Sequence, residues 1–113
     1  MLNDEVVLNT DGFLRFDPAK SLRQRAQAFL ASRQWSTPEV TYGDQPEPEL
    51  GEPPLWSFSF AFGLDHVRKY KGDWFADVEA LLAFVQDVVR EAKSEVVVQV
   101  SYRSKPWYSE HIV

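Results

Sequence analysis

Two segments of the chain alternate between large apolar residues and smaller or polar ones. In residues 55–62 every even position holds tryptophan or phenylalanine, and in residues 95–103 every even position holds valine or tyrosine. Successive side chains of a strand point to opposite faces, so this period of two predicts two strands, each with one buried face. The residues expected on the buried face are Trp56, Phe58, Phe60, Phe62, Val96, Val98, Val100 and Tyr102.

Two other segments repeat their apolar residues at spacings of three and four, which is the period of a helix. The first begins near Asp17, where an acidic N-cap followed by Pro18 favours a helix start, and continues to about Arg33. The second begins near Asp73, ends by Ser94 and is more strongly amphipathic. The buried stripe of this second helix is expected to contain Phe75, Val78, Leu82, Val85, Val89 and Ala92, and to be widened by Trp74, Leu81 and Val88.

Weaker patterns indicate further strands and a loop. Residues 39–42 predict a short strand, and residues 67–70 predict a segment that pairs back after a turn. Near the N-terminus, apolar residues on both sides of 9–12 predict either a hairpin or one bent strand. Residues 43–54 contain four of the seven prolines, and we expect them to form a solvated loop.

The resulting order of elements is β(β)αββαβ. Right-handed connections would place both helices on one face of an antiparallel or mixed sheet. We therefore predict an α+β fold, a two-layer sandwich of the ferredoxin-like βαββαβ type, with an extra N-terminal strand if residues 9–12 form a hairpin turn. The length of 113 residues suits a single α+β domain over residues 1–113.

Composition narrows the chemistry and the compartment. The chain has no cysteine, which excludes disulfides, thiolate metal sites and cysteine nucleophiles. No apolar run approaches the roughly 18 residues that a membrane-spanning helix needs. The acidic N-terminal residues lack the basic and apolar stretches of a signal peptide. We expect a cytoplasmic protein that does not bind membranes.

Residues that could carry catalysis are few. His66 lies in a predicted turn and His111 lies near the end of the chain, and their separation matches no metal-binding spacing. The chain contains no Gly-x-Ser-x-Gly nucleophile motif and no cluster of glycines that could hold a phosphate. The sequence therefore assigns no catalytic residue, no metal and no cofactor.

Acidic charge is concentrated between residues 39 and 52. Five acids and no base occur there, and they equal the net charge of −5 of the whole chain. Such a segment would attract a basic partner, because complementary charge speeds association. Residues 102–108 form a second candidate contact surface, since arginine, tryptophan and tyrosine are enriched at interfaces. The candidate partner-binding residues are Asp44, Glu47, Glu49, Glu52, Arg103, Trp107 and Tyr108.

Three tryptophans are spaced through the C-terminal half of the chain. Trp56 lies in its Ser-Phe-Ser-Phe strand, Trp74 heads the long helix and Trp107 lies in the tail. In these residues the chain resembles small bacterial immunity proteins of polymorphic and contact-dependent toxin systems, in particular the tryptophan-marked TriTu family. The resemblance implies a non-enzymatic protein, a monomer or homodimer, that binds and inhibits a cognate toxin domain, for example a basic nuclease.

Two other hypotheses remain open. One is a cofactor-free enzyme of the dimeric ferredoxin-like barrel type, with a pocket between helices and sheet and with His66 or Tyr102 as the candidate acid. A large polar pocket would favour this enzyme, whereas a packed aromatic core would favour a protein-binding module. The other is a nucleic-acid-binding module that uses Lys20, Arg23 and Arg25, and the net negative charge argues against it.

Overall fold

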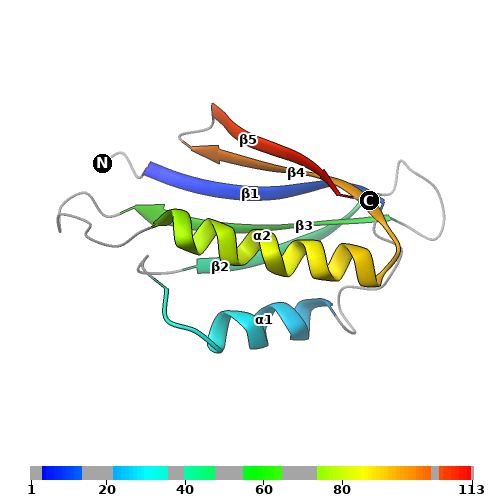
Figure 1. Cartoon of the computed structure of the whole chain (residues 1–113), viewed down its shortest axis with the longest axis horizontal. Helices are drawn as coiled ribbons and strands as arrows, with labels where there is room; N and C mark the ends of the chain where they lie inside the picture. The colour runs from blue at the N-terminus through cyan, green and yellow to red at the C-terminus, as the bar shows by residue number, and fades with distance from the viewer. Residues whose placement is uncertain are drawn as a thin grey trace.

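The structure is a computed structural model, which describes residues 4–13, 22–35, 40–47, 55–64, 74–102 and 105–112. The elements over these residues, shown in Figure 1, are β1 (Asp4–Phe13), α1 (Arg23–Ala31), β2 (Val40–Glu47), β3 (Leu55–Leu64), α2 (Trp74–Glu91), β4 (Glu95–Tyr102) and β5 (Lys105–Ile112). None of the helices in these ranges combines the length and the apolar character needed to cross a membrane.

The strands form one antiparallel sheet in the order β2-β3-β1-β4-β5. β1 lies at its centre, and both helices pack against one face of the sheet (Figure 1). The predicted α+β class, with two helices on one face of an antiparallel sheet, is therefore confirmed. The arrangement is compatible with a two-layer sandwich.

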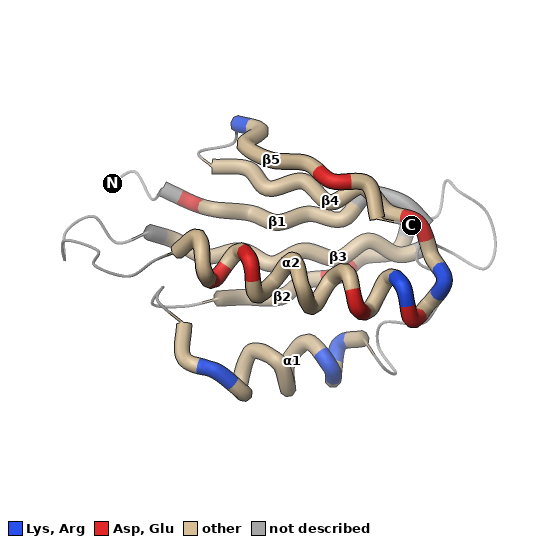
Figure 2. Tube along the Cα trace, viewed as in Figure 1, with Lys and Arg blue, Asp and Glu red and all other residues tan. Residues whose placement is uncertain are grey.

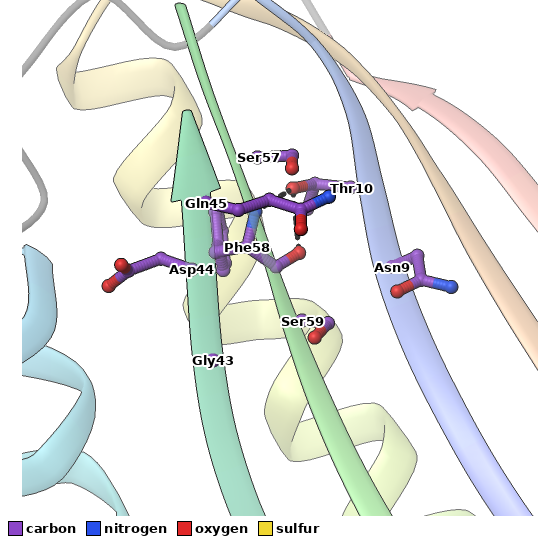
Figure 3. Close-up of a pocket in the computed structure, with 8 residues that line it drawn as sticks. All are labelled: Asn9, Thr10, Gly43, Asp44, Gln45, Ser57, Phe58 and Ser59. Atoms are coloured by element: carbon purple, nitrogen blue, oxygen red, sulfur yellow. Dashed lines mark hydrogen bonds between the residues drawn. The ribbon is translucent and has the colours of Figure 1, made fainter. Parts of the chain in front are cut away.

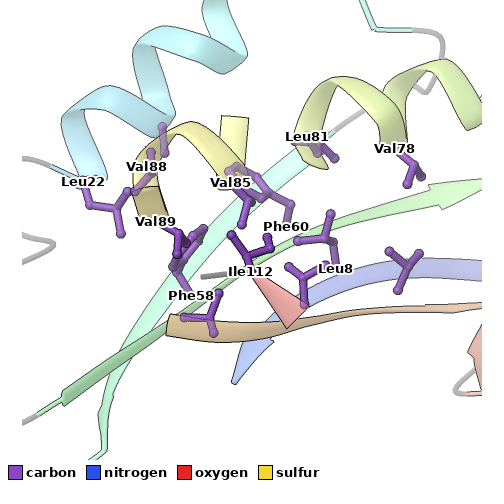
Figure 4. Close-up of a cluster of buried hydrophobic side chains, with 14 of the residues drawn as sticks. Leu8, Leu22, Phe58, Phe60, Val78, Leu81, Val85, Val88, Val89 and Ile112 are labelled. Atoms are coloured by element: carbon purple, nitrogen blue, oxygen red, sulfur yellow. The ribbon is translucent and has the colours of Figure 1, made fainter. Parts of the chain in front are cut away.

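The core lies between this sheet face and the helices (Figure 4). Of the side chains predicted to be buried in β3 and β4, all are buried except Trp56 and Tyr102, which are half-buried. Phe60 is completely buried and makes an edge-to-face contact with Phe84, with ring centroids 5.9 Å apart. The period of two thus assigned the buried face of both strands correctly.

The buried stripe of α2 lies within the predicted one but is narrower. Its buried apolar residues are Val78, Leu81, Val85, Val88 and Val89. Phe75, predicted to be buried, is 46% exposed. The apolar stripe of α2 is wider than the surface that the sheet can cover, so only its central rows reach the core.

The N-terminal segment is one long strand, which agrees with the second of the two predicted alternatives and not with the hairpin. β1 pairs with β4 from Val6↔Tyr102 to Phe13↔Glu95, straight through residues 9–12. The hydrogen bonds to β4 hold the glycine-containing segment extended. The additional strand of the sheet is instead β5, in the tail that the sequence predicted only as a contact surface.

The expected loop at residues 43–54 begins later than predicted. β2 continues to Glu47, and residues 43–47 pair with residues 55–59 of β3. Pro46 is tolerated because β2 is an edge strand, where the missing N–H can face away from the ladder. Residues 48–54, the predicted start of the first helix at Asp17 and the predicted strand at 67–70 lie outside the described residues.

A buried hydroxyl group joins β1 to β3. Among the described residues, the β1–β3 pairing ends at Asn9↔Ser59. At the next position the Thr10 hydroxyl donates a hydrogen bond to the Phe58 carbonyl at 2.9 Å and accepts one from the Phe58 N–H at 3.0 Å. Thr10 is 4% exposed. Where the two strands separate, its hydroxyl supplies the hydrogen-bond partners that the buried N–H and carbonyl of Phe58 need.

Replacing Thr10 with valine should destabilise the fold by about 2–5 kcal/mol. Valine has nearly the same shape but leaves two buried backbone groups of Phe58 without a partner. The free energy of unfolding, measured by denaturant titration, tests this expectation. Thr41→Val is the matched control, because the exposed Thr41 hydroxyl donates to the Ala61 carbonyl at the surface. Equal effects of the two substitutions would contradict the role given to Thr10.

Candidate functional site

A polar hollow of about 510 Å³ opens on the sheet face that the helices leave uncovered (Figure 3). Its lining residues come from β1, β2 and β3, namely Asn9, Thr10, Gly43, Asp44, Gln45, Ser57, Phe58 and Ser59. The hollow lies where the β1–β3 pairing ends. Its walls are low because Gly43, Ser57 and Ser59 are small residues. Its volume is within the range of small-molecule sites, about 300–1,000 Å³.

Among the lining residues whose side chains the structure describes, those on the open face are uncharged. Asn9 and Gln45 contribute amides, and Ser57 and Ser59 contribute hydroxyls. Each of these groups can donate and accept hydrogen bonds. Such a lining suits a polar ligand with several donors and acceptors. The sequence predicted these serines on the open face but gave no signal that β1 and β3 separate beside them.

Asp44, a predicted partner-binding residue, points away from the hollow towards α1 (Figure 3). Its carboxylate accepts two hydrogen bonds from the Arg23 guanidinium, from Nη2 at 2.7 Å and from Nε at 3.1 Å. The Asp44 side chain is 3% exposed. This carboxylate therefore holds α1 against β2 and is engaged within the chain.

The surroundings of Asp44 shift two pKa values. The hydrogen bonds from Arg23 lower the pKa of Asp44, and burial opposes this effect. Burial raises the pKa of Tyr42, and the nearby Asp44 raises it further. The Tyr42 hydroxyl is buried and has no partner in hydrogen-bonding geometry among the described residues.

Basic residues lie along α1, and acidic residues lie near both ends of α2 (Figure 2). Arg25 pairs with Glu91 at 2.9 Å, and Arg33 lies 3.8 Å from the buried Asp77. Together with the Arg23–Asp44 pair, these contacts occupy the basic groups of α1 with acids of the same chain. The hypothesis of a nucleic-acid interface on the first helix therefore gains no support from the described residues.

The remaining predicted site residues are dispersed. Glu49, Glu52, Arg103, His66 and Lys20 lie outside the described residues. Glu47 is the last residue of β2.

Trp107 and Tyr108 lie on β5 and are 47% and 42% exposed. Tyr102, the other candidate acid, stacks on Trp74 at 5.9 Å. Of the predicted site residues that the structure describes, Tyr102, Trp107 and Tyr108 are the ones that lie against other aromatic side chains.

We call the group Trp74, Phe75, Trp107 and Tyr108 the aromatic shelf. It joins the start of α2 to the start of β5. The Trp107 ring lies 5.3 Å from both the Trp74 and the Phe75 rings and 6.5 Å from the Tyr108 ring, between centroids. The sequence signalled Trp107 and Tyr108 by residue type, but their proximity to Phe75 follows only from the pairing of β5 with β4.

A shift in the β4–β5 register allows this contact. Val100 pairs with Tyr108, but Ser101 pairs with Pro106, so Trp107 is an extra residue in β5. A bulge of this kind redirects a side chain without ending the sheet. It lets Trp107 join Tyr108 on the helix side of the sheet.

Comparisons with known proteins give one informative match. No family model matches the chain, and no curated protein matches it. Among solved structures, a phage SAM lyase in complex with S-methyl-5'-thioadenosine is similar, with a TM-score of 0.61 over 97% of this chain and 89% of that one. The sequence identity is 10%, so the likeness concerns the fold.

This match corrects the interpretation of the chain as an immunity protein that inhibits a toxin. The structural neighbour is an enzyme with a small molecule bound, and the comparisons provide no link to immunity proteins. The acidic segment, which the sequence offered as a surface for a basic partner, is in its first part a paired strand whose Asp44 already binds Arg23. Clustered acids in a sequence cannot reveal which of them have partners within the chain.

The Arg23–Asp44 pair predicts a pH-dependent stability difference. Arg23→Gln should lower the free energy of unfolding by about 1–3 kcal/mol at pH 7, because the enclosed carboxylate loses its charged partner. The pKa of Asp44 is lowered by folding, so its contribution is present above the unfolded pKa of about 3.9 and is lost as the pH falls through the folded value. Denaturant titrations at pH 7 and below pH 3 should therefore show that the difference in unfolding free energy between Arg23→Gln and the parent is smaller in acid.

Arg25→Gln is the control for this experiment. The Arg25–Glu91 pair joins exposed side chains, so its loss should change stability by less than about 1 kcal/mol at either pH. A difference for Arg23→Gln that persists unchanged in acid would contradict the assignment to Asp44.

Proposed function

We propose that this chain is a cofactor-free enzyme that binds a sulfur-containing nucleoside in the polar hollow and cleaves a carbon–sulfur bond. The observation that carries the proposal is the fold likeness, over 97% of the chain, to a lyase whose structure holds S-methyl-5'-thioadenosine. The hollow supplies a place of suitable size for such a molecule. The cofactor-free enzyme was also one of the hypotheses that the sequence left open.

The strand order supports the finer description of the fold. In β2-β3-β1-β4, the two β–α–β units interleave with β1 and β3 at the centre, which is the arrangement expected of a ferredoxin-like sheet. We infer that β5 is an addition to this sheet beside β4. The barrel-type enzyme predicted from the sequence would have its pocket between helices and sheet. Buried aromatic and aliphatic side chains fill that space, so the proposed site lies on the opposite face.

The lining of the hollow matches the chemistry of a nucleoside. Carboxamides such as those of Asn9 and Gln45 can form paired hydrogen bonds with an adenine edge. The Ser57 and Ser59 hydroxyls can hydrogen-bond the ribose hydroxyls. These contacts would hold the nucleoside across β1, β2 and β3 without a charged residue.

A sulfonium substrate can lose its sulfur without help from a strong acid. When a carbon–sulfur bond of a sulfonium ion breaks, the electron pair stays on sulfur, which leaves as a neutral thioether and takes no proton. The carbon that loses sulfur would form its new bond to an oxygen of the substrate's own carboxylate, which closes a lactone and consumes no base or nucleophile of the protein. The protein would then contribute chiefly by orienting the substrate for this ring closure. S-adenosylmethionine is the test substrate of this class, and S-methyl-5'-thioadenosine is the corresponding thioether.

Two glycines provide a matched test of the hollow. A Cβ at Gly43 would meet only the Ser59 Oγ, at 3.9 Å, and a Cβ at Gly63 would meet no atom within 4 Å. Both residues are exposed strand positions, so both should accept valine without loss of stability. Gly43→Val fills part of the hollow, whereas Gly63 lies outside it, in a separate depression with Glu5 and Thr41.

We expect Gly43→Val to weaken binding of S-methyl-5'-thioadenosine at least tenfold and to slow cleavage of S-adenosylmethionine, while Gly63→Val behaves like the parent. Calorimetry measures the binding, and chromatography of the nucleoside product measures the cleavage. If neither Gly43→Val nor Gly63→Val changes the rate of cleavage, the reaction takes place outside the hollow. A parent protein that neither binds the thioether nor cleaves the sulfonium would overturn the proposed function.

A further inference from the structure

The aromatic shelf exposes more apolar ring surface than the fold requires. Phe75, Trp107 and Tyr108 are each between 42% and 47% exposed, although they lie beside a completely buried core. Trp74 stacks on Phe75 with ring centroids 4.2 Å apart, so the rings form a continuous surface from α2 to β5. Contiguous exposed aromatic side chains of this kind usually mark a binding surface.

The exposure of these rings is not explained by a strand of another molecule that pairs with β5. β5 begins with Lys105 and Pro106, and a register shift follows at Val100/Ser101. A lysine, a proline and a bulge are the features that discourage a foreign strand from adding to a sheet edge. The shelf is therefore better explained by a ligand that contacts the ring faces.

Glu110 places a negative charge beside the shelf. Its carboxylate accepts a hydrogen bond from the Tyr108 hydroxyl at 2.9 Å, and the Gln86 amide donates to both of its oxygens at 3.2 Å. These contacts fix the carboxylate and use part of its hydrogen-bonding capacity. The hydrogen bond to Glu110 also raises the pKa of Tyr108, so the phenol remains protonated as a donor at neutral pH.

A cation is attracted both to the face of an aromatic ring and to a carboxylate. Lysine and arginine head groups need several hydrogen-bond acceptors, and the carboxylate that accepts from the Tyr108 hydroxyl already has donors from two side chains within the described part of the chain. A sulfonium or quaternary ammonium ion has no N–H to satisfy and gains most from ring faces and a nearby negative charge. The arrangement of rings and carboxylate thus favours an alkylated cation.

We propose that the aromatic shelf is a binding site for a small alkylated onium ion, with the cation on the Tyr108 and Trp107 rings and Glu110 as its counter-charge. The ligand class is a quaternary ammonium or a sulfonium group. The site lies on the helix side of the sheet and the polar hollow on the opposite face, so the proposal does not depend on the proposed function.

Choline and 3,3-dimethyl-1-butanol test the role of the charge. The two molecules have nearly the same shape, but only choline is a cation. Nitrogen–proton NMR spectra of the indole N–H groups report the binding, since Trp107 and Trp74 belong to the shelf. Trp35 serves as an internal reference, because its indole N–H donates to the Leu30 carbonyl at 2.8 Å and Arg33 lies over its ring.

Choline should shift the Trp107 signal with an affinity about tenfold higher than that of the neutral analogue, and trimethylsulfonium should act like choline. Equal responses to choline and to the neutral analogue would reduce the shelf to a hydrophobic surface and overturn the proposal. The absence of any saturable shift at Trp107 or Trp74 would also overturn it.

Substitutions separate the ring contribution from the charge contribution. Tyr108→Leu removes a ring, and Glu110→Gln removes the charge while keeping the shape. Each should weaken choline binding at least threefold. Glu95→Gln is the matched control, because Glu95 is an exposed carboxylate at the start of β4 that pairs with His111. Weakening by Glu95→Gln as large as that by Glu110→Gln would show a general effect of net charge and contradict a site at Glu110.

Gly43→Val distinguishes this proposal from the proposed function. It should leave choline binding unchanged even where it abolishes nucleoside binding. Loss of choline binding in this variant would contradict the separation of the two sites.

Discussion

The alternation of residues along β3 is the constraint on which the rest of the structure depends. Its even positions carry the phenylalanines that build the core with α2, and its odd positions from 57 to 63 are serine, alanine and glycine. One strand therefore makes both the packed side of the sheet and the small-residue surface on which the hollow opens. A shift of one residue in the register of β3 would exchange its two faces, so the packed side and the small-residue surface would be lost together.

Polar contacts fasten the structure where this packing ends. The Thr10 hydroxyl supplies backbone partners where β1 and β3 separate, and the Arg23–Asp44 pair attaches α1 to the edge strand β2. Each contact encloses a group that would be costly to leave unpaired. The same separation of β1 from β3 that requires Thr10 also creates the hollow, so the stability of this region and its capacity to bind a ligand have a common origin.

The protein presents two surfaces with different chemistry. The hollow offers uncharged hydrogen-bonding groups on the open sheet face, whereas the aromatic shelf offers ring faces and one carboxylate on the helix side. We propose a nucleoside ligand for the first and an alkylated cation for the second.

The sequence by itself determined the strands and helices whose residues repeat regularly, together with the buried face of β3 and β4, because periodicity reports directly on which side chains avoid water. It did not determine that residues 9–12 stay extended or that the tail is β5, since those outcomes depend on hydrogen bonds to strands far away in the chain. The tryptophan and tyrosine of the shelf were recognisable as residues of interest, whereas the serines of the hollow were expected only as small polar residues of the open sheet face. Their grouping into sites was decided only by the tertiary structure: the hollow needs three strands to meet at one point, and the shelf needs a bulge that brings Trp107 against Trp74 and Phe75, 32 or more positions away in the sequence.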